Sequence, residues 1–192
     1  MRIEGKRVLL REQMDADADF FCTWYNDPDT MKKCGFTEPV TREELVDGFH
    51  QETRDSIWFT VVDKDTSEIL GETGLLRMFP EWRTTDLSII LPDPSRYRKG
   101  YGSETIQLMF DLAFNHYDFN RVAIGVVGFN VNALAFYERV GFKRDGIQEE
   151  GYFCNGTYGD FIMMRLLRRE YEERIRIRQA CQATETSLPF NG

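Results

Sequence analysis

The chain has 192 residues, of which 42% are hydrophobic and 29% are charged, and its formal net charge is -8. This composition suits one domain with its own core, and the negative charge argues against unaided binding to nucleic acid or to an anionic membrane. The polar first residues predict no signal peptide, and no apolar run approaches the ~18 residues of a membrane helix. Four cysteines without a C-x-x-C pair and two distant histidines predict neither a disulfide framework nor a metal site. We therefore expect a reduced, cytoplasmic protein without metal.

Apolar patterns predict the elements of the first half of the chain. A strand over Arg7–Arg11 precedes a helix from Asp17 to about Asn26, which ends at the turn Asn26–Pro28. Thr41 and Glu44 have the spacing of a capping box, and they open a helix that runs to about Arg54. Three antiparallel strands follow, at Ile57–Val62, Ile69–Met78 and Thr84–Leu91.

The second half alternates between helices and strands. Apolar residues at 106, 109, 110, 113, 114 and 117 predict a helix over Ser103–Tyr117 with one face on a sheet. A strand at Arg121–Val127 and a helix with an apolar stripe from Ala133 to Val140 follow, and Gly141 is the expected stop. Two strands, Phe142–Tyr152 and Thr157–Leu167, flank Asn155-Gly156, a strong hairpin signal. This order predicts an α/β (α+β) domain over residues 1–167, a mixed sheet with helices on both faces, and a charged helix with a fraying tail over residues 168–192.

The turn from Arg98 to Glu104 carries the first functional signal, because it joins an apolar strand to an amphipathic helix. Backbone N–H groups at such a helix start lack partners and can bind an anion such as a pyrophosphate. Gly100 and Gly102 lack the Cβ that would keep a phosphate from the backbone, and Arg98 and Lys99 can add charge. Alone, this pattern is more often only a tight turn. It is not a kinase or dehydrogenase loop, since G-x-x-x-x-G-K-[ST] and G-x-G-x-x-G are both absent.

The second signal lies about thirty residues later, in Asn130-x-x-Ala133-x-x-x-Tyr137-x-x-x-Gly141-Phe142. Alone, Tyr137 would be assigned to core packing. Together with the glycine turn, the pattern resembles the GNAT superfamily of acetyl-CoA-dependent N-acetyltransferases, and the resemblance extends over most of the chain. The turn Trp24–Pro28 is similar to the branch that contains ribosomal-protein and polyamine acetyltransferases.

The resemblance implies a GNAT-like, mostly antiparallel sheet of six to seven strands with one splayed parallel pair. It implies acetyl-CoA as cosubstrate, with the pantetheine arm in the splay and the pyrophosphate on the loop Tyr97-x-x-Gly100-x-Gly102. Tyr97 departs from the usual Gln or Arg, but Arg96 and Arg98 flank it. Asn132 either contacts the cofactor or caps the following helix. The implied cofactor contacts are Ile89, Ile90, Leu91, Arg98, Lys99, Gly100, Tyr101, Gly102, Ser103, Asn130 and Asn132.

The resemblance also implies how the acetyl group moves. Tyr137 matches the general acid that protonates the departing thiolate, and no metal takes part. Asp86 matches a position that is often acidic, so it is one candidate for the base, and water-relayed deprotonation is the other. The acceptor is expected to be a primary amine, either of a polyamine or of a protein N-terminus, that attacks directly in a ternary complex, with an aminoglycoside-type antibiotic as an alternative.

The first two helices and the last hairpin are expected to form an acidic, aromatic-lined acceptor site. Its expected members are Asp27, Asp29, Glu38, Glu43, Glu44, Glu149, Glu150 and Asp160, with Trp24, Tyr25, Phe36, Tyr152 and Phe153. A non-catalytic module that senses acetyl-CoA or a polyamine is the competing hypothesis, and the intact Tyr137 argues against it. The branch also makes a homodimer possible.

Overall fold

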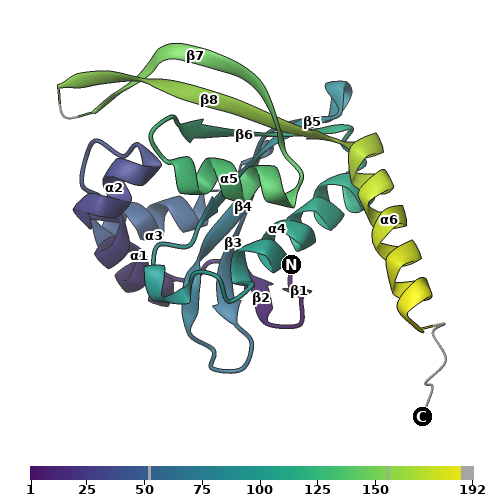
Figure 1. Ribbon diagram of the computed structural model, residues 1–192. Helices are drawn as coiled ribbons and strands as arrows, with labels where there is room; N and C mark the ends of the chain where they lie inside the picture. The colour runs from purple at the N-terminus through teal and green to yellow at the C-terminus, as the bar shows by residue number, and fades with distance from the viewer. Residues whose placement is uncertain (52, 155, 187–192) are drawn as a thin grey trace.

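A computed structural model describes residues 1–51, 53–154 and 156–186, and of residues 181–186 it describes the backbone alone (Figure 1). The strands are β1 (Ile3–Glu4), β2 (Val8–Arg11), β3 (Ile57–Asp63), β4 (Ile69–Phe79), β5 (Thr84–Ile90), β6 (Arg121–Val127), β7 (Lys143–Cys154) and β8 (Thr157–Leu167). The helices are α1 (Ala18–Tyr25), α2 (Pro28–Cys34), α3 (Arg42–His50), α4 (Tyr101–Phe110), α5 (Val131–Val140) and α6 (Arg168–Thr186). A π-helical segment, Asp111–His116, extends α4.

The sheet has eight strands in the order β1-β2-β3-β4-β5-β6-β8-β7. Every neighbouring pair is antiparallel except β5 and β6, which pair in parallel through only three residue pairs, from Thr84 with Arg121 to Asp86 with Ala123. Beyond Asp86 the two strands separate. The predicted mixed sheet with one splayed parallel pair is therefore confirmed, with eight strands where six to seven were expected.

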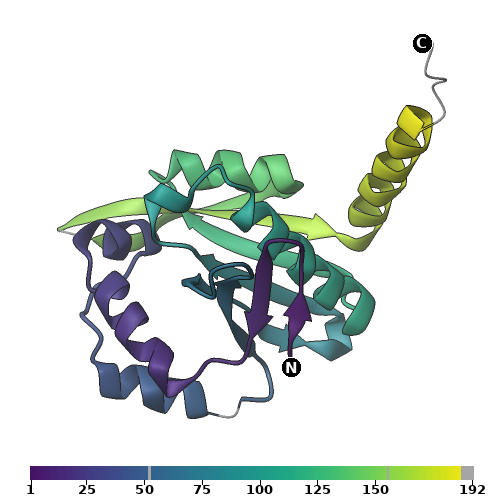
Figure 2. The same ribbon diagram turned by 90° about the horizontal axis from the view of Figure 1, so that it is seen from below.

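Helices pack on both sides of this sheet. The main core cluster combines strand residues with Ile106 and Met109 of α4, Leu134 of α5 and Tyr171 of α6. Helices α1 to α3 form a separate layer, in which Phe21 and Tyr25 of α1 are buried (Figure 2). No helix in the described ranges has both the length and the apolar character needed to cross a bilayer.

Three boundaries differ from the prediction. The Asn26–Pro28 turn leads directly into α2, because the Asp27 carboxylate accepts a hydrogen bond from Thr30 N (2.9 Å) and Pro28 occupies the first helical position. The two-residue strand β1 is too short for a pattern, and α3 ends at His50 rather than near Arg54. Asn155 and the predicted fraying end, residues 187–192, lie outside the described residues.

The connection from β2 to α1 is fixed by a buried carboxylate. Asp17 is 1% exposed and accepts hydrogen bonds from both Nη atoms of Arg11 (2.7 Å each), from Thr60 Oγ1 (2.7 Å) and from Met14 N (3.0 Å). Burial alone would raise the pKa of Asp17, but these donors outweigh it and the net shift is downward. The charged form therefore stabilises the fold.

We expect Asp17→Ala to lower the free energy of unfolding by about 3–5 kcal/mol, because it leaves the Arg11 guanidinium without its partner. Asp19→Ala is the control: Asp19 pairs with Arg42 on the surface, and its loss should cost no more than about 1 kcal/mol. Because the folded-state pKa of Asp17 is depressed, its contribution is present above the unfolded pKa, near ~3.9, and is lost as the pH falls through the folded value. Urea titrations of the three proteins measure these differences, and equal losses in both variants would contradict the assignment.

Candidate functional site

The opening between β5 and β6 is the centre of the candidate site. Residues 87–90 of β5 keep their pairing with β4, but no described strand pairs with their other edge. Ile89 and Ile90 lie in this unpaired end, and Leu91 follows it, so the pantetheine contact that the resemblance implies for them stays a prediction. Gly71 permits the geometry from the other side, because a Cβ there would lie 2.0 Å from the Ile90 carbonyl oxygen.

The turn that precedes α4 borders this opening. Gly100 caps the helix with φ of 92°, a left-handed conformation that favours glycine. Glu104 N donates to Gly100 O (3.0 Å), so the helical ladder begins there. The N–H groups of Tyr101, Gly102 and Ser103 belong to the first turn, which has no carbonyls of its own for them. Such a helix start can bind an anion, and the pyrophosphate contact of these residues stays a prediction.

Among the described residues, the basic side chains around the turn are of two kinds, those with an ion pair and those without one. Arg98 and Lys99 are exposed, and neither forms an ion pair with any residue the structure describes. Arg96 is occupied, since it pairs with Glu68 and lies 3.7 Å from Asp93. Arg98 and Lys99 are therefore the side chains of this turn whose charge is available to compensate for Tyr97.

Tyr101 and Gly102, two of the expected cofactor contacts, also have structural roles in this turn. The Tyr101 hydroxyl donates to Asp63 Oδ2 (2.5 Å), so Tyr101 offers the cofactor its backbone N–H rather than its side chain. A Cβ on Gly102 would point at the Phe136 ring, 3.2 Å away. Gly102 thus lets α4 and α5 approach each other, and Gly100 is the residue at the exposed start of the helix.

Tyr137 projects from α5 into an aromatic environment. Its ring lies 5.3 Å from that of Phe136 and 5.8 Å from that of Phe142, and the residue is 8% exposed. Its hydroxyl forms no hydrogen bond with a described residue, yet it is not among the fully buried hydroxyls that lack a partner, which in the described residues are those of Tyr25 and Thr105. Burial, with smaller contributions from Cys34 and Tyr97, raises the pKa of Tyr137 well above its ordinary value. The phenol therefore stays protonated and can donate.

A carboxylate that the sequence reading missed approaches the same opening from the α1–α3 side. Glu72 of β4 pairs directly with Ile90, and Gln13 Nε2 donates to its Oε2 (2.8 Å). Burial raises the pKa of Glu72. The Tyr25 hydroxyl is fully enclosed and lies near this carboxylate without reaching hydrogen-bond geometry. Burial raises the pKa of Tyr25, and the charge of Glu72 raises this pKa further. The available signal was the one acidic residue inside the predicted strand Ile69–Met78.

Cys34 connects the two sides electrostatically. Burial and the neighbouring Glu72 raise the pKa of its thiol to about 11, and Cys34 in turn raises the pKa of Tyr137. Cys34 therefore lies within electrostatic range of both Glu72 and Tyr137, although the three residues come from a strand and two helices far apart in the sequence.

Asp86 lies in the paired part of β5 and β6, away from the opening between the two strands. It sits in the closed part of the parallel pair, opposite Ala123, and it forms an ion pair with Arg77 (2.5 Å). Four residues of strand, or ~13 Å, separate it from Ile90. Asp86 is thus brought together with a surface arginine rather than with Tyr137.

Asn130, rather than Asn132, caps the start of α5. Asn130 caps the helix by accepting from Ala133 N (3.2 Å), because it immediately precedes the first helical residue. The prediction that Asn132 caps this helix is wrong, since Asn132 is its second residue and is exposed. Whether either residue contacts the cofactor stays a prediction.

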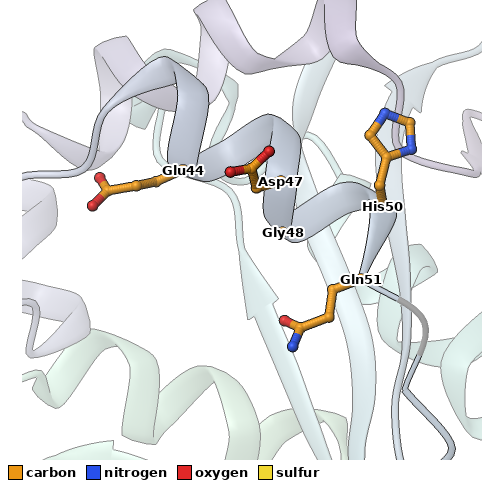
Figure 3. A pocket seen from close by; sticks show the side chains of 5 residues that line it. All are labelled: Glu44, Asp47, Gly48, His50 and Gln51. Carbon is orange, nitrogen blue, oxygen red and sulfur yellow. The ribbon is translucent and has the colours of Figure 1, made fainter.

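The predicted acidic cluster does not converge on one point. Several members have structural roles: Asp27 caps α2, Glu44 forms the predicted capping box with Thr41, and Asp160 Oδ1 accepts from Glu150 N (3.1 Å). A shallow groove of about 590 Å³ does follow α3, but its side chains spread in different directions (Figure 3). Its lining residues are Glu44, Asp47, Gly48, His50 and Gln51.

Comparison with known proteins connects this geometry to a family. A profile of the acetyltransferase (GNAT) domain matches residues 7–143. The spermidine N(1)-acetyltransferase of Vibrio cholerae is 26% identical over 172 residues, which cover 88% of this chain and 98% of that protein. A putative ribosomal N-acetyltransferase of Bacillus subtilis is 34% identical over 74 residues, which cover 38% of this chain and 40% of that protein.

A solved structure extends the similarity to the fold. The crystal structure of spermidine N-acetyltransferase from V. cholerae in complex with CoA and spermine matches with a TM-score of 0.79 at 25% identity, covering 87% of this chain and 99% of that one. These findings confirm the resemblance predicted from the glycine turn and from the Asn130–Phe142 pattern, in family and in branch.

Proposed function

The chain belongs to the GNAT family and is an acetyl-CoA-dependent N-acetyltransferase, and from this premise we propose that it acetylates a primary amine of the polyamine type by direct attack in a ternary complex. The observation that carries the proposal is the opening between β5 and β6, because it joins a helix start suited to anions to a buried phenol and a half-buried carboxylate. The cofactor would place its pyrophosphate on the N–H groups after Gly100 and its pantetheine arm along residues 89–91. Its thioester would then lie between Tyr137 and Glu72.

The proposed reaction needs two proton movements. The neutral amine attacks the thioester carbonyl carbon, and a backbone N–H at the unpaired end of β5 stabilises the oxyanion. The amine nitrogen then loses a proton to the Glu72 carboxylate, the C–S bond breaks, and the Tyr137 hydroxyl protonates the departing sulfur. Solvent returns the proton from Glu72 to Tyr137 after the products leave. We assign the base to Glu72 in preference to Asp86, because Asp86 is paired with Arg77 at the closed end of the splay.

A polyamine is the favoured acceptor for two reasons. The acceptor side presents the Glu72 carboxylate next to the Tyr25 and Trp24 helix, and a carboxylate beside aromatic rings binds cationic amines. The V. cholerae relative is named for spermidine and has been crystallised with spermine. Protein N-termini are the second candidate, supported by the similarity to the putative ribosomal acetyltransferase. The cytoplasmic location and the possible homodimer stay predictions.

Thiol release from acetyl-CoA across a panel of acceptors tests the proposal. The panel contains spermidine, spermine, a set of peptides with free N-termini and an aminoglycoside. We expect the polyamines to give the highest kcat/KM. A higher value for peptides would favour the second candidate, and a higher value for the aminoglycoside would favour an antibiotic acetyltransferase.

Binding measurements separate a silent enzyme from a sensor. Calorimetric binding of acetyl-CoA and spermidine without release of thiol would support a sensing module and contradict catalysis. Mass spectrometry of the product identifies the acetylated nitrogen and so checks that transfer goes to a primary amine.

A further inference from the structure

A row of four residues crosses the sheet and ends at the opening between β5 and β6. Arg11 of β2 lies opposite Thr60 of β3. Thr60 lies opposite Glu72 of β4, and Glu72 lies opposite Ile90 of β5. Directly opposite residues of antiparallel strands project to the same face of a sheet. Thr60 Oγ1 donates to Asp17 at the start of α1 (2.7 Å), so this face is the one that the α1–α3 layer covers.

Gln13 reaches Glu72 on this face from the segment that follows β2. One carboxylate fixes the segment on both sides of Gln13, because Asp17 accepts hydrogen bonds from the Arg11 guanidinium (2.7 Å) and from Met14 N (3.0 Å). Gln13 is half-buried, and its Nε2 donates to Glu72 Oε2 (2.8 Å). The buried Asp17 therefore holds the stretch of backbone from which Gln13 contacts Glu72.

Among the described residues, three polar groups interact with the Glu72 carboxylate: the Gln13 amide, the Tyr25 hydroxyl of α1 and the Cys34 thiol of α2. The pKa values of the hydroxyl and of the thiol are both raised, so none of the three groups is charged at neutral pH. Burial raises the pKa of Glu72, while Tyr25 and Gln13 oppose this rise. Of these two, Gln13 is the one that forms a hydrogen bond of good geometry. Gln13 is therefore the described group that most directly favours the charged carboxylate.

We propose that Gln13 is a positioning residue, which holds the Glu72 carboxylate in the orientation and in the charged form needed to take a proton from the attacking amine. The inference rests on the proposed role of Glu72 as the base. A charged carboxylate only accepts hydrogen bonds, and an amide N–H that donates to it favours this form over the protonated one. With Oε2 occupied by Gln13, Oε1 is the oxygen left for the proton of the amine. Gln13 thus acts on the reaction through Glu72.

The pH dependence of kcat/KM in Gln13→Met tests the inference. Methionine is similar in length to glutamine and has no N–H donor, so Glu72 should bind its proton more readily in the variant. We expect kcat/KM at neutral pH to fall about tenfold, as for the loss of one hydrogen bond to a charged group, and to return toward the wild-type value as the pH rises. The affinity for CoA should stay within about twofold of the wild-type affinity.

The same amine is used with both proteins, so its own ionisation affects the two pH profiles equally and the difference between them reports the carboxylate. Gln179→Met is the matched control, because Gln179 is an exposed residue of α6, the helix whose far end projects from the body (Figure 2). This variant should keep the wild-type profile. A loss in Gln13→Met that is equal at every pH would show a distorted or unfolded site, and the inference would be wrong.

A double variant measures whether Gln13 acts through Glu72. In the Glu72→Gln background, adding Gln13→Met should change the residual kcat/KM by less than about twofold, because the base that Gln13 positions is gone. A further tenfold loss in this background would overturn the inference.

Failure of this inference is distinguishable from failure of the proposed function. An inactive Glu72→Gln together with a wild-type pH profile in Gln13→Met would remove Gln13 and keep Glu72 as the base. Full activity in Glu72→Gln would contradict the assignment of the base, and with it the role of Gln13. Absence of thiol release by the wild-type protein with every acceptor would contradict the proposed reaction itself.

Discussion

The Tyr137→Phe variant is expected to lose a factor of about 10²–10⁴ in kcat and to bind CoA as tightly as the wild-type protein. The substitution keeps the ring that packs against Phe136 and Phe142 and removes only the hydroxyl. In water a phenol is a weaker acid than a thiol, with pKa values of ~10 and ~8.5. The burial that raises the pKa of Tyr137 also raises the basicity of a thiolate formed beside it, which offsets the weaker acidity of the buried phenol.

Steady-state thiol release and calorimetry together measure this split between kcat and binding. Tyr171→Phe is the control, since Tyr171 is also a buried tyrosine, with its hydroxyl donating to Asp111 on the far side of α4. It should keep kcat and lose only stability. Wild-type thiol release by Tyr137→Phe would remove the phenol from the chemistry and leave Tyr137 as a packing residue.

Glu72→Gln is expected to lower kcat by a similar factor, about 10²–10⁴, without destabilising the protein. Glutamine is isosteric and can still accept from Gln13, but it cannot take a proton from the amine. The folded-state pKa of Glu72 is raised, so above that value the charged form costs stability relative to the unfolded chain. Removing the charge should therefore leave the thermal midpoint at neutral pH unchanged or higher, and the difference should vanish below the unfolded pKa. A variant that is less active and more stable than the wild-type protein is typical of the removal of a catalytic group.

The pH dependence of kcat/KM distinguishes the candidates for the base. Wild-type activity should rise with pH through the raised pKa of Glu72, and this limb should be absent from Glu72→Gln. Glu68→Gln, which alters an exposed carboxylate paired with Arg96 just before β4, is the matched control. Full activity in Glu72→Gln together with a loss in Asp86→Asn would return the role to Asp86.

The sequence predicted the elements whose signals are local. The Thr41–Glu44 capping box, the apolar stripe of α4 and the glycine turn all depend on residues a few positions apart, and each lies where it was expected. The splay of β5 and β6 was inferred through the family resemblance, because three parallel residue pairs leave no periodic mark in a sequence.

The acceptor side could not be predicted in the same way. Glu72 gains its environment from Gln13, Tyr25 and Cys34, which lie on three other elements, and burial of one carboxylate depends on how those elements pack. Counting acidic residues near the helices and the hairpin instead selected carboxylates that cap helices or face solvent.

The three residue pairs that join β5 to β6 have a mechanical consequence. Strands β1 to β5 and strands β6 to β8 form two halves of the sheet, and only the three residue pairs between β5 and β6 join these halves by strand pairing. A cosubstrate lying in the opening beyond these pairs would bridge the two halves like an additional strand. Binding of the cosubstrate should therefore make the whole sheet more rigid.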